Sequence, residues 1–304
     1  MALELSDTSN LLKSARTGNR RSLAKLLTAI ERGQESEITS EESWILGVTG
    51  APGVGKSTLI GRMIEHWQSN GEKVAILAVD PSSPVSGGSF LADRVRIPQA
   101  DIDDSIFFRS LASKNFPGGI VPNIGKMCQA LSACGWGRIV IETVGSGQSE
   151  ISIVAFADIV LLVDGPDRGD IIQAEKAGIL EIADSIAINK SDIPSSNSAI
   201  EDIRRSLELS EGDNRTVHLV SAINGDGISE LISDLESIAP DPGRLGIRNR
   251  EKLISYWVSL LLSHEEIDSQ LVNLGNGSIT VRDAIYSMGS SMNFGGTANG
   301  RNDE

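Results

Sequence analysis

A glycine-rich segment that ends in lysine, serine and threonine has the residue types of a phosphate-binding loop. Residues 50–58 read Gly-Ala-Pro-Gly-Val-Gly-Lys-Ser-Thr and fit the pattern G-x-x-x-x-G-K-[ST]. The backbone N–H groups of such a loop can surround a polyphosphate, while the lysine contacts the β- and γ-phosphates and the serine hydroxyl ligates Mg²⁺. We therefore expect a nucleoside triphosphate site formed by Gly50, Ala51, Pro52, Gly53, Val54, Gly55, Lys56, Ser57 and Thr58.

The residues on either side of this loop support the phosphate-binding interpretation. Residues 44–49 form a short apolar run suited to a buried strand, and residues 58–67 carry apolar side chains at helical spacing. A strand, a glycine-rich turn and a helix in this order direct the helix N-terminus toward an anion. The alternative, a glycine-rich turn without a ligand, is less favoured in this context.

A second motif, about 130 residues further on, predicts which base is bound. Residues 184–192 form an apolar strand that ends in Asn189-Lys190-Ser191-Asp192, the N-K-x-D pattern of GTPases. The Asp192 carboxylate could accept hydrogen bonds from N1–H and N2–H₂ of guanine, whereas adenine presents an acceptor at N1. Asn189 would hold neighbouring loops together, and the Lys190 side chain would cover the plane of the base. We expect GTP and GDP to be preferred over adenine nucleotides.

A third segment, residues 216–222, is another apolar strand, and it ends beside the expected base site. It ends in Ser221-Ala222, whose backbone N–H groups could contact guanine O6. We expect Ser221, Ala222 and Ile223 to complete the base site.

Three acidic residues fall at the ends of predicted strands or in the loops that follow them, where Mg²⁺ would lie beside the phosphates. Asp80 ends one strand, Asp93 lies in a glycine-rich loop, and Glu142 ends another strand and opens the segment Glu142-Thr-Val-Gly145. Mg²⁺ prefers hard oxygen ligands, and its protein sites use one or two carboxylates. We expect Ser57, Asp80, Asp93 and Glu142 at the metal, although Asp80 could equally cap a turn.

The catalytic groups expected from the sequence are Lys56, Asp80, Glu142 and Gly145, with the Gly145 N–H reaching the γ-phosphate. Three arginines, Arg94, Arg96 and Arg109, could neutralise charge in the transition state or could form ordinary ion pairs. Gln148 is a candidate for positioning water by its location alone.

Composition excludes several classes of protein. The formal net charge is −14, which argues against a nucleic-acid or anionic membrane surface. The two cysteines, Cys128 and Cys134, cannot form a disulfide scaffold and favour a reducing compartment. The chain has no apolar run long enough for a signal peptide or a membrane span. We expect a cytoplasmic protein without nucleic-acid or membrane partners.

The order of predicted elements indicates an α/β fold, a doubly wound and mostly parallel sheet of the P-loop NTPase type. We expect an N-terminal helical extension at 1–43, a GTPase domain at 44–240, and a C-terminal helical arm with a disordered tail at 241–304. A helix at 250–262 could pack on its own domain or form a dimer interface. The predicted strands are 44–49, 73–80, 105–109, 138–143, 158–164, 184–189 and 216–221.

Together these segments resemble the MeaB/ArgK family of GTPases. The resemblance covers most of residues 44–222, and its most specific parts are V-D-P-S-S-P at 79–84 and E-T-V-G-S-G-Q-S-E at 142–150. It implies a GTP-hydrolysing chaperone, typically a homodimer, that assists cofactor loading and protection of an adenosylcobalamin-dependent acyl-CoA mutase. The segment 164–176 matches the family's third switch but is more polar here, so the partner mutase could differ.

A scaffold that binds GTP without turnover is less favoured, because Lys56, Ser57 and Glu142 are all present. Two other functions remain open on the sequence. One is a nucleotide-dependent kinase or ATPase linked to amino-acid transport (lysine, arginine and ornithine), which Asp192 argues against. The other is a metal-delivery GTPase, for which the chain has few soft ligands: two cysteines and three histidines.

Overall fold

The computed structural model consists of two units, residues 1–255 and 256–304, which are described separately. It describes residues 5–34, 38–39, 41–81, 104–113, 121, 123–143, 155–166, 179–208, 213, 215–239, 241–262 and 264–291.

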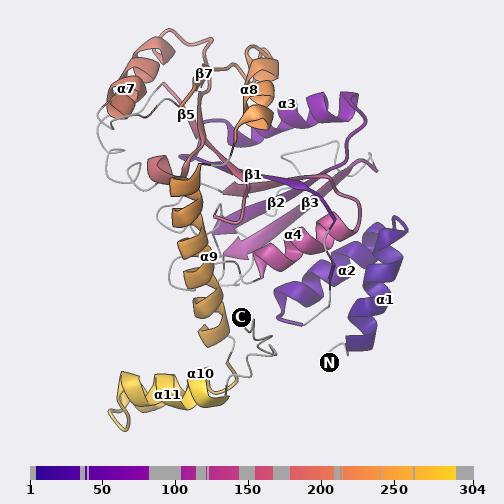
Figure 1. Cartoon of the computed structure of the whole chain (residues 1–304), viewed down its shortest axis with the longest axis vertical. Helices are drawn as coiled ribbons and strands as arrows, with labels where there is room; N and C mark the ends of the chain where they lie inside the picture. The colour runs from indigo at the N-terminus through magenta and orange to yellow at the C-terminus, as the bar shows by residue number, and fades with distance from the viewer. Residues whose placement is uncertain are drawn as a thin grey trace, which may run out of the picture. The chain divides into compact units, whose positions relative to one another are not determined.

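The first unit is built on a seven-stranded sheet in which every pair of neighbouring strands is parallel (Figure 1). The order across the sheet is β3-β2-β4-β1-β5-β6-β7. The strand order reverses at β1, and ligands of such sheets bind in the crevice at the carboxyl ends of the strands there. The strands are β1 (Trp44–Thr49), β2 (Val74–Pro81), β3 (Ile106–Ser113), β4 (Arg138–Thr143), β5 (Ile159–Asp164), β6 (Ser185–Ile188) and β7 (Val217–Leu219).

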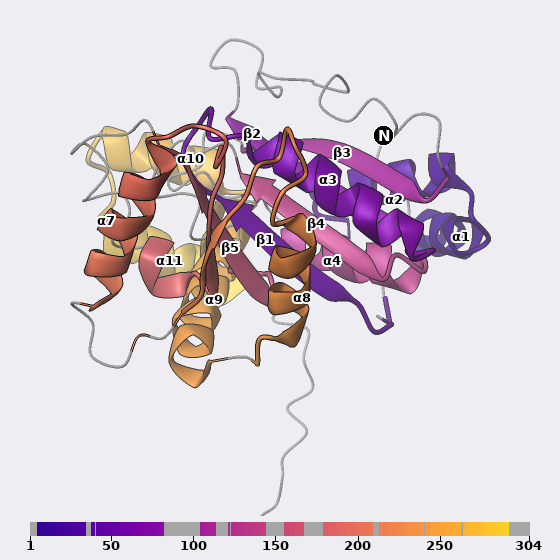
Figure 2. The ribbon, with the colours of Figure 1, turned by 90° about the horizontal axis from the view of Figure 1, so that it is seen from above.

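Helices cover both faces of this sheet, as Figure 2 shows. Successive residues of a strand point to opposite faces, so Ile76 packs with one group of helices while Leu77 packs with another. The first group contains α3 (Lys56–Ser69) and α8 (Ile228–Ser237). The second group contains α1 (Leu5–Arg16), α2 (Arg20–Glu31) and α4 (Ile124–Ala133), while α7 (Ser196–Glu208) packs on β5 and β6. Burial on both faces explains why these strands are apolar throughout.

All seven expected strands are confirmed, with changes at their ends. The largest change is at β3, which extends to Ser113 rather than ending at residue 109, and β7 stops at Leu219 rather than at residue 221. The chain turns after it, and Ser221 pairs with Asp226 in an isolated antiparallel bridge. This turn shapes the expected base site.

The α1–α2 helical pair begins the first unit. Asn19 caps α2, because its side chain accepts a hydrogen bond from Ser22 N. The apolar residues of this helix lie on one face, where Leu23, Leu26, Leu27 and Ile30 are buried. The outer face of α2 therefore carries its polar residues.

Helix α9 (Pro242–Leu262) begins earlier than the helix expected at 250–262. Pro242 fits the first position of a helix, where its missing N–H is not needed. Asp241 Oδ1 accepts from Arg244 N at 2.9 Å and so caps this start. The helix therefore starts directly after Asp241.

The first part of α9 is tied to the amino ends of β5 and β6 by buried charges. Arg248 is completely buried and donates to Asp184 Oδ2 at 2.5 Å and to Asp158 O at 3.1 Å. Asp184 also accepts from Arg244 Nε at 3.1 Å and from Val160 N at 2.9 Å. Because unpaired charges are costly to bury, these contacts hold Arg248 and Asp184 in one arrangement.

The two cysteines lie on or beside α4 and are both free. Burial raises the pKa of the Cys128 thiol to about 12 and that of Cys134, at the end of the helix, to about 11. Both are therefore protonated at neutral pH. Among the described helices, none has the length and apolar content needed to cross a membrane.

The second unit contains the end of α9 with α10 (Ile267–Gly275) and α11 (Val281–Ser291). Thr280 and Asp283 form a reciprocal cap at the start of α11, since each side chain accepts a hydrogen bond from the other's backbone N–H. Ala284 and Met288 are buried, but α10 has no buried residue. Most of the apolar surface of this unit is exposed.

Candidate nucleotide-binding site

The glycine-rich loop lies between the end of β1 and the start of α3, at the carboxyl edge of the sheet. Two of its glycines are required by close contacts. A Cβ on Gly50 would lie 1.9 Å from Val163 O, and a Cβ on Gly55 would lie 2.4 Å from the side-chain nitrogen of Asn189. Gly55 also has a left-handed backbone, with φ of 94°. Other residues at these two positions would displace the neighbouring strand or Asn189.

The N-terminus of α3 is directed at this loop. The helix begins at Lys56, and Gly55, which precedes it, provides no side-chain cap. The first N–H groups of a helix have no partner within the helix, and the helix dipole adds partial positive charge there. The sequence motif thus folds into an arrangement that can bind an anion.

Lys56 adds a full positive charge inside the loop. Its side chain is buried, and its ammonium donates to Gly50 O at 2.5 Å and to Ala51 O at 2.9 Å. These carbonyls keep the charge against the loop rather than in solvent. The lysine therefore lies where the sequence places it, beside the backbone that would surround a phosphate.

Ser57 and Glu142, predicted as metal ligands from segments 85 residues apart, are in direct contact. The Ser57 hydroxyl donates to Glu142 Oε1 at 2.6 Å, and Glu142 is only 3% exposed at the end of β4. The next residue, Thr143, donates to the hydroxyl of Thr49 at the end of β1 at 3.1 Å. Two hard oxygen groups therefore lie beside the phosphate loop.

The other residues expected at the metal are less fully described. The backbone of Asp80 lies at the end of β2, two residues beyond Ala78, which pairs with Glu142 across the sheet. Its side chain, Asp93 and Gly145 lie outside the described residues, as do Arg94, Arg96 and Gln148.

Asn189 connects the phosphate loop to the base site. Its side chain donates to Val54 O at 2.9 Å and accepts from Ala222 N at 3.0 Å, and its own N–H donates to Asp164 O at 2.8 Å. Asn189 is 2% exposed, so these bonds replace lost hydration. The structure thus brings together three segments that the sequence places far apart.

Asp192 lies exposed beside this connection. Its Oδ1 accepts from the Ser221 hydroxyl at 2.7 Å. Lys190 has a left-handed backbone, with φ of 64°, and its carbonyl accepts from Ile193 N at 2.9 Å. This turn sets the direction of the aspartate, which is oriented by a hydroxyl but remains accessible to a ligand.

The backbone donors expected at guanine O6 have partners within the protein. Ala222 N donates to Asn189, and Ser221 N donates to Asp226 O at 3.0 Å. Ile223 follows with 68% of its surface exposed. In this arrangement the backbone N–H groups of Ser221 and Ala222 hold the base loop in place through bonds within the protein.

Arg62 is a residue of the site that the sequence did not indicate. From α3, its Nε donates to Ala222 O at 2.9 Å and its Nη2 donates to Ile223 O at 2.8 Å. Its third nitrogen, Nη1, donates to Glu65 Oε2, one turn further along the helix, at 3.0 Å. The helix that begins at the phosphate loop therefore also holds the base loop.

Arg109 contacts α2 rather than the phosphate loop. It donates to Ala24 O, Thr28 Oγ1 and Glu31 Oε2 on α2, at 3.1, 3.2 and 2.6 Å. Of the two roles considered for this residue, the ion pair is confirmed and the transition-state role is not supported. Within the described ranges no three His, Cys, Asp or Glu side chains come close enough together to hold a metal ion.

We predict that Arg62→Met selectively weakens nucleotide binding. Loss of two charge-assisted hydrogen bonds to the base loop should raise the Kd for GTP by roughly tenfold, about 1.4 kcal/mol. The Kd for pyrophosphate, which needs only the phosphate loop, should stay within about twofold of wild type. Calorimetry with both ligands measures this difference, and Arg204→Met, at an exposed position on α7, is the control. Equal losses for GTP and pyrophosphate would contradict the assignment.

Comparisons with known proteins agree with this geometry. The family described as Methylmalonyl Co-A mutase-associated GTPase MeaB matches residues 10–271. A putative GTPase of Pyrococcus abyssi is 35% identical over 261 residues, 80% of this chain and 80% of that protein. The fused isobutyryl-CoA mutase of Cupriavidus metallidurans is 32% identical over 238 residues, 72% of this chain but 22% of that protein.

Among solved structures, the crystal structure of a LAO/AO transport system kinase is similar in fold. It has a TM-score of 0.60 and 22% identity, and the match covers 95% of this chain and 99% of that one. Three observations agree. The sheet is parallel with a phosphate loop after β1, the N-K-x-D segment is joined to that loop, and the family match covers residues 10–271. This chain belongs to the MeaB family of P-loop GTPases.

Proposed function

We propose that this GTPase hydrolyses GTP with Mg²⁺ and thereby assists an adenosylcobalamin-dependent acyl-CoA mutase. Its role would be to support loading of the cofactor and to protect the mutase. The observation that carries the mutase link is the relative in which a segment similar to this chain forms part of a fused isobutyryl-CoA mutase. The proposed setting is the cytoplasm, which suits two free thiols.

The residues at the phosphate loop fit a magnesium ion. Ser57 and Glu142 offer a hydroxyl and a buried carboxylate in contact with each other, and hard oxygen ligands of this kind are what Mg²⁺ prefers. Asp80 and Asp93 are proposed to complete the site on the basis of sequence alone. When bound, the ion would offset negative charge on the phosphates.

The protein's own contribution to hydrolysis is positioning and charge. Lys56 and the N-terminus of α3 would stabilise charge that develops on the phosphates. Gly145 is proposed to donate its N–H to the γ-phosphate, because it follows Glu142 by three residues. Asp192 and Asn189 would hold the guanine end, with Asn189 setting its distance from the phosphate loop.

Asp192→Asn should change the base preference. The variant loses the acceptor for N1–H and N2–H₂ of guanine, so we expect the Kd for GTP to rise roughly 10- to 100-fold. Xanthosine triphosphate should gain affinity, because the new amide can donate to its O2. Fluorescence titration measures both, with Asp226→Asn, an exposed neighbour in the base loop, as the control. An equal loss of pyrophosphate affinity would show that Asp192 does not read the base.

The chaperone role can be tested with purified methylmalonyl-CoA and isobutyryl-CoA mutases. We expect the protein with GTP and Mg²⁺ to lengthen the active lifetime of at least one of them during turnover. Lys56→Ala, which removes the charge inside the phosphate loop, should abolish the GTP-dependent part of this effect. If neither mutase forms a complex or changes its lifetime, the proposed partner is wrong, while GTP hydrolysis by the protein alone would still stand.

The second unit is proposed to mediate a homodimer. Val272 and Tyr286 are 67% and 80% exposed, and Leu271, Val281 and Ile285 are each more than half exposed. An apolar surface of this kind marks an interaction site, and a second copy is the simplest partner. Light scattering should give twice the chain mass of 32.3 kDa. A monomer mass at micromolar concentration would contradict the proposal.

A further inference from the structure

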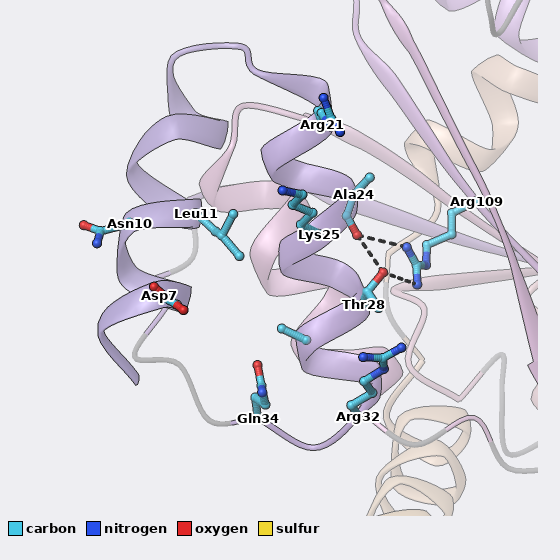
Figure 3. A pocket seen from close by; sticks show the side chains of 11 residues that line it. Asp7, Asn10, Leu11, Arg21, Ala24, Lys25, Thr28, Arg32, Gln34 and Arg109 are labelled. Atoms are coloured by element: carbon cyan, nitrogen blue, oxygen red, sulfur yellow. Dashed lines mark hydrogen bonds between the residues drawn. The ribbon is translucent and has the colours of Figure 1, made fainter. Parts of the chain in front are cut away.

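A groove of about 680 Å³ follows the outer face of α2, away from the nucleotide site (Figure 3). One wall is α1, through Asp7, Asn10 and Leu11, and the opposite side is closed by Arg109 of β3. β3 is one of the two edge strands, three places from β1 in the sheet. The groove shares no residue with the nucleotide site, so binding to it can be tested separately from GTP binding.

The groove carries positive charge in an acidic protein. Arg21, Lys25 and Arg32 are exposed along one stripe of α2, whereas the chain has a net charge of −14. Within the described residues, no hydrogen bond or ion pair is made by these three side chains. Like charges four residues apart on a helix, as in Arg21 and Lys25, repel each other. A bound anion would remove this repulsion.

Two buried polar atoms of the groove also lack a partner among the described residues. They are Arg109 Nε, a donor, and Gln34 Oε1, an acceptor. Arg109 is fixed by its bonds to α2 and Glu31, and Figure 3 shows Gln34 extending toward the gap between the two helices. Buried polar atoms are normally paired. A ligand with both an acceptor and a donor would satisfy these two.

The arrangement of charge suggests the shape of the ligand. Arg21 and Lys25 lie toward one end of α2 and Arg32 toward the other, with Thr28 and Arg109 between them (Figure 3). Arg32, the residue that ends α2, lies eleven positions after Arg21, about 16 Å along the helix axis at 1.5 Å per residue. The volume falls in the range of small-molecule sites, about 300–1,000 Å³. A single phosphate would reach only one end.

We propose that this groove binds a small molecule with two phosphate groups joined by a hydroxylated linker, as in a sugar bisphosphate. The phosphates would contact the arginines at the two ends, since guanidinium groups bind phosphate through paired hydrogen bonds. Hydroxyl groups of the linker would donate to Gln34 Oε1 and accept from Arg109 Nε. Leu11, Ala24 and Ala29 would contact its carbon atoms.

The test is calorimetry of fructose 1,6-bisphosphate with the full chain saturated with GDP. The double variant Arg21→Gln/Arg32→Gln should lower the affinity roughly tenfold or more. The matched control Arg204→Gln/Arg250→Gln removes the same charge at exposed positions on α7 and α9 and should bind as wild type does. GDP affinity should be unchanged in both variants, which shows that they are folded.

Three results would overturn the proposal. The first is no bisphosphate binding by the wild-type protein, and the second is equal weakening in both double variants, which would indicate a general effect of charge. The third is that inorganic phosphate or glutarate binds as tightly as the bisphosphate, which would exclude a site that reads two separated phosphates.

Discussion

One amide side chain fixes the distance between the two ends of the nucleotide site. Asn189 donates to the phosphate loop at Val54 O and accepts from the base loop at Ala222 N. Its position also dictates a residue of the loop, because any side chain on Gly55 would collide with its nitrogen. A buried amide that lost either partner would leave a polar group unsatisfied, so the two loops are constrained together. We propose that this fixed distance lets one nucleotide contact both loops at once.

Charged side chains also join segments that are distant in the sequence. Arg62 gives α3 a second connection to the base loop, so that one helix carries the phosphate end and supports the base end. At the opposite edge of the sheet, Arg248 and Asp184 join α9 to the strands through a pair that is buried almost completely. In both places a guanidinium with several fixed donors binds backbone or carboxylate oxygens from distant segments. The strands provide the frame, and these side chains set where the loops lie on it.

The sequence predicted the strands well because parallel strands buried on both faces are continuous apolar runs, as in residues 159–164. It assigned Ser57 and Glu142 to one metal site because the loop after β1 and the end of β4 lie at the carboxyl edge of neighbouring strands, and the two side chains are in contact. Arg62 was missed because a bond from a side chain to a carbonyl 160 residues away leaves no pattern in the sequence. The helix expected to start at residue 250 starts at Pro242, because proline fits the first position of a helix although it breaks a helix interior. Arg109 was ambiguous for a similar reason: residue type alone does not tell an ion pair from a catalytic cation.

The environment of the two cysteines has a practical consequence. Their thiols have pKa values of about 12 and about 11, so very little thiolate is present at neutral pH. Peroxide and maleimide react with the thiolate form, and neither native sulfur offers much of it. A cysteine introduced on the exposed surface of α7 would therefore be modified in strong preference to the native pair. Fluorescent dyes could be attached there without first removing Cys128 from the core.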